Sequence, residues 1–116
     1  MKVEFIFSEF GLRTTANQPG GFTDEFRLDP TYSSVKQFFP DAKLTLYTDR
    51  EELATNYSDV EVRLVDIDNS PFTKSNHRWG WHCCDYYEAK GLLNSDADIA
   101  ISVDSDLMFV SDEVKT

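Results

Sequence analysis

The sequence has little cysteine and no long apolar run. Its two cysteines, Cys83 and Cys84, are adjacent, and neighbouring cysteines rarely bond to each other because the disulfide geometry is strained. A disulfide framework is therefore excluded, which favours a reducing compartment, and we expect a cytoplasmic location. No apolar run approaches the roughly eighteen residues of a membrane-spanning helix, and the first residues carry no apolar segment of signal-peptide length. We expect neither a membrane span nor a signal peptide.

Basic residues are also scarce. The chain has 21 acidic and 11 basic residues, which gives a formal net charge of −10 at pH 7. The acidic excess is spread along the chain, with ten acids and six bases in residues 1–60 and eleven acids and five bases in residues 61–116. Such a surface repels nucleic acid phosphates and anionic membranes, so we expect neither as a partner. Acidic surfaces of this kind most often serve solubility. The more specific interpretation is an acidic pocket that binds a divalent cation.

Several familiar site motifs are missing. The sequence contains neither G-x-G-x-x-G nor G-x-x-x-x-G-K, so the usual dinucleotide and P-loop interpretations have no support. Neither His77 nor His82 lies in a motif typical of a nucleophilic triad. These histidines and the two cysteines could suggest zinc, but zinc ligands usually come in separated pairs. The thiols are better explained as small buried hydrophobes.

What the sequence does contain is an alternation of strand and helix patterns. With 116 residues, 41% of them hydrophobic, it suits a single domain over residues 1–116 with a real core. The alternation predicts an α/β class with a mostly parallel open sheet and flanking helices. We predict strands at Val3–Phe7, Lys43–Tyr47, Glu61–Val65 and Ile99–Val103, a long loop at Ser8–Thr23, and helices from Asp29 to Pro40, at Arg50–Tyr57 and at Ser75–Leu93. On the last helix, Trp79, Cys83, Tyr86 and Leu93 recur at nearly helical spacing and are predicted to face the core.

Two carboxylates follow the last predicted strand. Asp104 and Asp106 come directly after an apolar, β-branched run, and alternate residues of an extended chain point to the same side. Open α/β sheets bind ligands beyond the carboxyl ends of their strands. Two carboxylates this close repel each other unless a cation or proton lies between them. Mg²⁺ and Mn²⁺ prefer oxygen ligands of this kind, often together with substrate phosphates, so we expect a Mn²⁺ or Mg²⁺ site at Asp104 and Asp106.

Three segments in order resemble the nucleotide-binding half of the GT-A-fold glycosyltransferases. DIAISVDSDLMFV (98–110) is similar to the D-x-D segment of these enzymes, and DYYEAKGLL (85–93) to the helix that precedes it in several families. YSSVKQFFPDAKLTLYTD (32–49) resembles their first helix and second strand. The resemblance implies a Rossmann-like nucleotide-sugar-binding fold. It also implies that this chain is the nucleotide-binding half of such an enzyme, without the half that binds the acceptor.

The same resemblance implies a nucleotide-diphospho-sugar site and a set of residues around it. Asp104 and Asp106 would lie at the metal, with Asp104 and Ser105 also at the sugar nucleotide. Apart from the resemblance, Arg78 and Asp85 are seven residues apart and share a face of one predicted helix, which could meet the nucleotide. They could instead form a surface ion pair over a packed tryptophan. The remaining candidates are Phe7, Ser8 and Glu9, which would lie near the nucleobase, and Asp49, which would line the same crevice.

The leading hypothesis is therefore a glycosyltransferase-like domain that binds a nucleotide-diphospho-sugar through a divalent metal, with an unknown acceptor. A non-catalytic nucleotide-, metal- or partner-binding module is the alternative, and it would self-associate through the face left by a missing half. Haloacid-dehalogenase-type phosphatases also place D-x-D after an apolar strand, but their motif normally continues Gly-Thr, whereas here Leu107 and Met108 follow.

Overall fold

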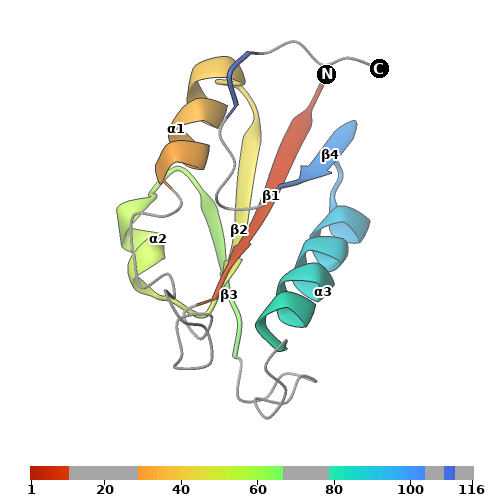
Figure 1. Cartoon of the computed structure of the whole chain (residues 1–116). Coiled ribbons are helices and arrows are strands. Elements are labelled where there is room, and N and C mark those ends of the chain that lie inside the picture. The colour runs from red at the N-terminus through yellow and green to blue at the C-terminus, as the bar shows by residue number, and fades with distance from the viewer. Residues whose placement is uncertain (11–28, 67–78, 104–108, 112–116) are drawn as a thin grey trace.

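A computed structural model of the chain describes residues 1–10, 29–66, 79–103 and 109–111, with the side chains of residues 79–83 left out. Strands and helices alternate along the described chain, as the sequence predicts (Figure 1). The strands are β1 (Val3–Glu9), β2 (Lys43–Thr48), β3 (Glu61–Leu64) and β4 (Ile99–Ser102), and the helices are α1 (Asp29–Phe38), α2 (Glu52–Asn56) and α3 (Trp79–Asn94).

The described strands form one sheet in the order β3-β2-β1-β4, and every pair in it is parallel. β1 is paired on both sides, with Phe5 opposite Leu44 of β2 and Ile101 of β4. The α/β class with a parallel sheet and flanking helices is thereby confirmed. No helix within the described ranges combines the length and the apolar character needed to cross a bilayer.

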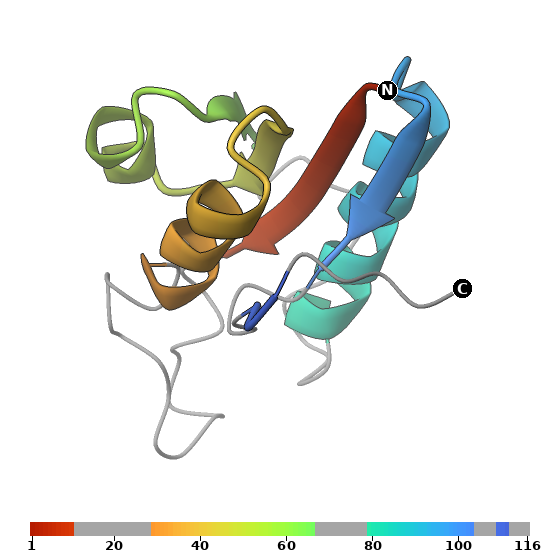
Figure 2. The same ribbon diagram turned by 90° about the horizontal axis from the view of Figure 1, so that it is seen from above.

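Two separate apolar clusters cover the two faces of the sheet. α1 and α2 lie on one face, where Phe5 and Phe7 of β1 pack with Val35 of α1 and Leu53 of α2 (Figure 2). α3 lies on the other face, where a smaller cluster joins Ile6, Phe10, Tyr47 and Cys84. The alternation of side chains along β1 explains the division, because odd-numbered residues point to one face and even-numbered residues to the other.

The chain after β4 returns to the α1 face. The Phe109 ring packs against Phe5 and Phe39, with ring centroids 5.4 and 5.6 Å apart, and the Phe109 amide donates a 2.8 Å hydrogen bond to Ser34 Oγ. On the other side of residues 104–108, the Val103 amide donates a 3.0 Å bond to the Ile6 carbonyl. The described chain is therefore held to the core immediately before and immediately after residues 104–108.

The predicted core face of α3 is wrong for the residues that the structure describes. Tyr86 is 46% exposed and Leu93 is 86% exposed, whereas the buried positions of α3 are Cys84, Glu88 and Gly91. Apolar residues occur around the whole circumference of this helix, so its sequence pattern selects no face clearly. The choice follows instead from Gly91, whose missing side chain lets the helix lie close to Ile6.

The end of the first strand also differs from the prediction. β1 continues through Ser8 and Glu9, which we had expected to begin a loop. Ser8 lies opposite Tyr47 and Glu9 opposite Thr48, so pairing with β2 overrides the weak strand preference of these two residues.

Candidate functional site

The strand order reverses at one point of the sheet, between β1 and β4. From β1 the chain moves outward to β2 and β3, and it then returns to the opposite side of β1 to form β4. The order therefore reverses between β1 and β4. In open α/β sheets this reversal point, beyond the carboxyl ends of the two strands, is the usual place for a ligand.

Three of the candidate residues lie in the last part of β1 and are buried. Phe7 is 1% exposed and belongs to the core on the α1 face, while Ser8 and Glu9 are each 3% exposed. Ser8 and Glu9 are the last residues of a central strand, so they lie at the carboxyl edge of the sheet, with their side chains on opposite faces. Asp49 directly follows β2 at the same edge and is half-buried.

The remaining candidates are separated from this group or are not described. Asp85 lies on α3 and is exposed. Arg78, Asp104, Ser105 and Asp106 lie outside the described residues, so their arrangement stays a prediction. The structure does describe the strand that leads to the last three of them. β4 pairs with β1 up to Ser102, and the Val103 amide donates one further hydrogen bond to the Ile6 carbonyl.

Within the described ranges, no group of three or more histidine, cysteine, aspartate or glutamate side chains could hold a metal ion. The metal site predicted from the sequence depends on Asp104 and Asp106, which lie outside those ranges. Their chemistry fits Mg²⁺ or Mn²⁺, since both ions are bound in proteins by one or two carboxylates.

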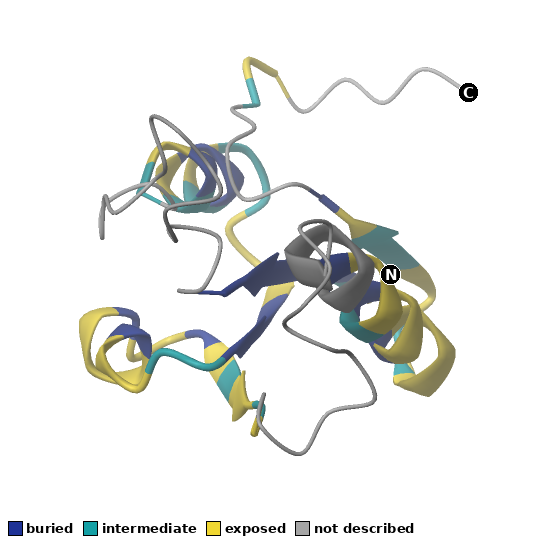
Figure 3. Ribbon diagram, turned by 60° about the horizontal axis from the view of Figure 1, so that its bottom comes forward, coloured by how far each residue is buried: buried dark blue, intermediate teal, exposed yellow. Residues whose placement is uncertain are grey.

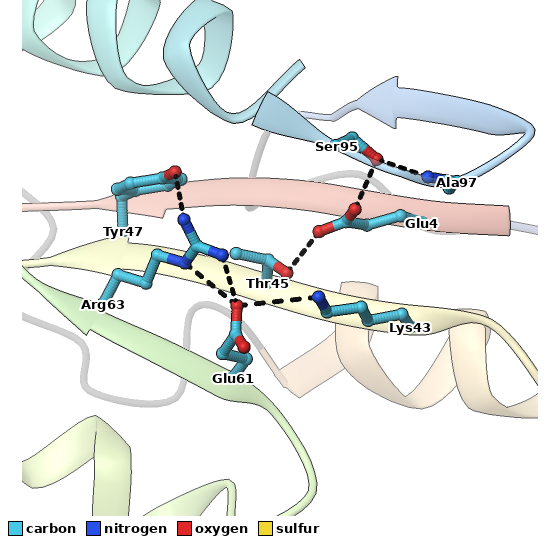
Figure 4. Close-up of polar contacts among 8 residues, drawn as sticks. All are labelled: Glu4, Lys43, Thr45, Tyr47, Glu61, Arg63, Ser95 and Ala97. Atoms are coloured by element: carbon cyan, nitrogen blue, oxygen red, sulfur yellow. Dashed lines mark hydrogen bonds and ion pairs between the residues drawn. The ribbon is translucent and has the colours of Figure 1, made fainter. Parts of the chain in front are cut away.

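The structure also reveals a polar cluster that sequence analysis did not find. Glu4 lies in the middle of the sheet and is only 3% exposed. Thr45 Oγ1 and Ser95 Oγ each donate a 2.5 Å hydrogen bond to its carboxylate, one to each oxygen (Figure 4). These bonds offset the cost of burying the polar group and connect β1 to β2 and to the turn that follows α3.

Next to Glu4, charged side chains lie over the outer part of the same face. Glu61 Oε2 accepts bonds from Arg63 Nη2 at 2.7 Å and Arg63 Nε at 2.9 Å, and it lies 3.7 Å from Lys43 Nζ. Arg63 Nη1 donates a 3.2 Å bond to the Tyr47 hydroxyl. The hydrogen bonds from Arg63 hold the pKa of Glu61 below its usual value, and the same contact raises the pKa of Arg63. Both groups stay charged across the physiological pH range.

An open groove of about 410 Å³ adjoins this charged group, at the side of the sheet where β3 ends. Its described walls are Tyr47, residues 63–66 and, on α3, Tyr87 and Lys90. The Tyr47 and Tyr87 rings are stacked, with centroids 5.7 Å apart. We call this feature the Arg63–Lys90 groove.

The sequence carries a partial signal for these features. Lys43, Thr45 and Tyr47 alternate with Leu44 and Leu46, which marks one face of β2 as the more polar face. Their partners come from the register, which sets Thr45 opposite Glu61 and Tyr47 opposite Arg63. That register joins segments about sixteen residues apart, and no local pattern specifies it.

Comparisons of the chain with protein-family models, with curated proteins and with solved structures found no significant match.

Proposed function

We propose that this chain is a nucleotide-sugar-binding domain of the GT-A type, in which Asp104 and Asp106 hold Mn²⁺ or Mg²⁺ against the diphosphate of the donor. One observation carries the proposal. The sheet order reverses between β1 and β4, and the D-x-D sequence begins two residues after the end of β4. Paired carboxylates would then stand where open α/β sheets bind their ligands.

The roles of the chain's own residues follow from this position. Asp104 and Asp106 are proposed metal ligands, and Ser105 is a proposed contact to the sugar nucleotide. Ser8, Glu9 and Asp49 lie at the same edge of the sheet and are proposed to contact the nucleoside. When bound, the metal would neutralise phosphate charge and stabilise a diphosphate leaving group. Sugar transfer to an acceptor is proposed on the same basis, and a cytoplasmic location remains a prediction.

Calorimetric titration of UDP and GDP into the purified chain, with and without Mn²⁺, tests the proposal. We expect one nucleotide to bind with Mn²⁺ and to lose about tenfold or more in affinity without it, because the cation cancels the repulsion between phosphates and carboxylates. The double variant Asp104→Asn/Asp106→Asn should abolish the metal-dependent part.

The matched control is Asp41→Asn/Asp96→Asn, which removes the same charge from two exposed aspartates that precede β2 and β4, away from the proposed site. This control should bind as the unchanged chain does. If a folded chain binds neither nucleotide with Mn²⁺, or if both double variants behave alike, the nucleotide-sugar site is wrong for this chain. The non-catalytic interaction module would then be the better hypothesis.

We also propose that the chain self-associates through the β4 edge. β4 has a neighbour on one side only in the described sheet, so the backbone groups of its other edge are available for pairing. Leu93 and Ile99 lie at this side and are 86% and 42% exposed. A second copy presents the same edge, and a twofold axis would pair the two strands.

A further inference from the structure

The Arg63–Lys90 groove brings two cations together in a chain that is strongly acidic. The formal net charge is −10, yet Arg63 at the end of β3 and Lys90 on α3 line the same 410 Å³ space. Small-molecule sites commonly have volumes of roughly 300–1,000 Å³. The groove lies over β2 and β3, on the other side of β1 from the β1–β4 reversal point. It shares no wall residue with the site proposed above, although Tyr47 is the register neighbour of Ser8.

The guanidinium of Arg63 is held in place before any ligand arrives. Its Nε and Nη2 donate to Glu61, its Nη1 donates to Tyr47, and its Cζ lies 5.6 Å from the centroid of the Tyr47 ring (Figure 4). Each terminal nitrogen makes one of these bonds and carries two N–H groups, so each keeps a donor for a further acceptor. A planar guanidinium with spare donors matches the oxygens of a phosphate or carboxylate.

Lys90 supplies the second charge from across the groove. Its ammonium lies 5.9 Å from the centroid of the Tyr87 ring, and the side chain is exposed. The Tyr87 and Tyr47 rings are stacked on each other, so each cation lies near one ring of the same aromatic pair. Asp66 is the one described carboxylate among the walls of the groove, and Glu61 is occupied by Arg63 and Lys43.

We propose that the Arg63–Lys90 groove binds the phosphate group of a small phosphorylated molecule, with Arg63 and Lys90 as its ligands. The rigid guanidinium orients the phosphate, and the more mobile Lys90 closes on it. The volume exceeds that of a phosphate ion alone, which leaves room for the group that carries it. Asp66, among the walls of the groove, opposes the phosphate charge.

A titration monitored by amide NMR of the ¹⁵N-labelled chain tests this site, in a buffer free of divalent cations. The probes are inorganic phosphate, ribose 5-phosphate and ribose, at constant ionic strength. We expect saturable shifts of the amides of residues 63–66 and 87–91 with both phosphate compounds, tighter for ribose 5-phosphate, and none with ribose. Equal affinity for the two phosphate compounds would support an oxyanion site and identify free phosphate as sufficient.

Variants distinguish phosphate binding in this groove from a general attraction of phosphate to cationic side chains. Lys90→Met should weaken phosphate binding about tenfold, the loss typical of one charge-assisted hydrogen bond, and Lys90→Arg should retain it. Asp66→Asn should strengthen binding, because it removes a like charge from the phosphate's surroundings. The control is Lys36→Met, an equally charged change on α1, on the far face of the sheet, and it should leave the affinity unchanged.

Lys90 is exposed, so its variants should fold, and their amide spectra report this directly. Shifts that spread over all the cationic surface, that fail to saturate, or that persist unchanged in Lys90→Met would overturn the proposal. Phosphate binding that survives in Asp104→Asn/Asp106→Asn would separate this groove from the proposed metal site.

Discussion

At the scale of single residues, Gly91 decides how closely α3 approaches the sheet. A Cβ placed on Gly91 would lie 2.8 Å from Ile6 Cγ2 and 3.1 Å from Tyr47 Cε2, which is closer than carbon atoms pack. Ile6 and Tyr47 are both buried, with little room to move. Because Gly91 has no side chain, α3 can lie directly on Tyr47. The hydroxyl of Tyr47 in turn accepts a hydrogen bond from Arg63.

Gly91→Ala should lower the free energy of unfolding by about 1 kcal/mol. Overpacking a core costs roughly 1–3 kcal/mol, and the better helix propensity of alanine returns up to about 1 kcal/mol. Urea denaturation measures the difference. In an Ile6→Ala background the same change should cost clearly less, because the two Ile6 atoms nearest the added Cβ are gone and only the 3.1 Å contact with Tyr47 Cε2 remains. A Gly91→Ala chain that is more stable in both backgrounds would contradict this packing.

At the scale of elements, hydrogen bonds tie α1 to the segments that precede β3. The Tyr32 hydroxyl on α1 donates a 2.7 Å bond to Asp59, and Lys36 Nζ lies 3.0 Å from the same carboxylate. Tyr57, at the end of α2, donates to Asp29 at the start of α1. The bond to Asp59, together with burial, raises the pKa of Tyr32 to about 12, and the same bond lowers the pKa of Asp59.

Tyr32→Phe should lower the free energy of unfolding by about 0.5–1 kcal/mol near neutral pH, because one partly exposed hydrogen bond is lost. The folded pKa of Tyr32 lies above its unfolded value of about 10, so the contribution is complete below pH 10 and disappears as the pH rises through about 12. The folded pKa of Asp59 is depressed, so the contribution also disappears as the pH falls through that value.

Urea unfolding at a series of pH values measures where the stabilising contribution of the Tyr32–Asp59 bond is lost, at acid pH and at alkaline pH. The difference between the unchanged chain and Tyr32→Phe should be largest between them. Tyr32→Phe should add little further loss in an Asp59→Asn background, since the ionised acceptor is already gone. A difference that stays constant from acid to strongly alkaline pH would show that the tyrosine acts by packing alone.

At the scale of the whole molecule, the two edges of the sheet differ in character. The β3 edge presents the charged residues Glu61 and Arg63, which solvate well, beside one exposed apolar residue, Leu64. Leu93 near the end of α3 and Ile99 at the start of β4 are exposed apolar residues. Figure 3 shows exposed stretches on the outer part of α3, in contrast to the buried central strand β1. Exposed apolar residues beside an unpaired strand favour association, whereas charges on an edge discourage it.

The double variant Leu93→Lys/Ile99→Lys should shift the chain toward a monomer, because like charges would meet across a twofold interface at β4. Sedimentation velocity at several concentrations measures the change. Leu64→Lys is the control, since Leu64 is 55% exposed on β3, at the other side of the sheet, and its replacement should have no such effect. An unchanged chain that stays monomeric at every concentration would rule out the proposed self-association.

The sequence by itself determined the local elements. Apolar runs such as Val3–Phe7 and Ile99–Val103 specify strands. Asp29-Pro30, followed by apolar residues at helical spacing, specifies α1. Both signals depend only on residues that are close together in the sequence. The alternation of these elements was enough to predict the parallel α/β class. It also identified the D-x-D sequence after β4 as the leading candidate site, which remains a prediction.

Only the tertiary structure decided how these elements face one another. The order β3-β2-β1-β4, the burial of Glu4 and the meeting of Arg63 with Tyr47 depend on pairing between distant segments. The face of α3 was mispredicted for the same reason. Tyr86 and Leu93 look like core residues in the sequence, but Gly91 fits against Ile6 and turns them outward. Close packing against a partner, which the helix sequence does not contain, selects the buried face.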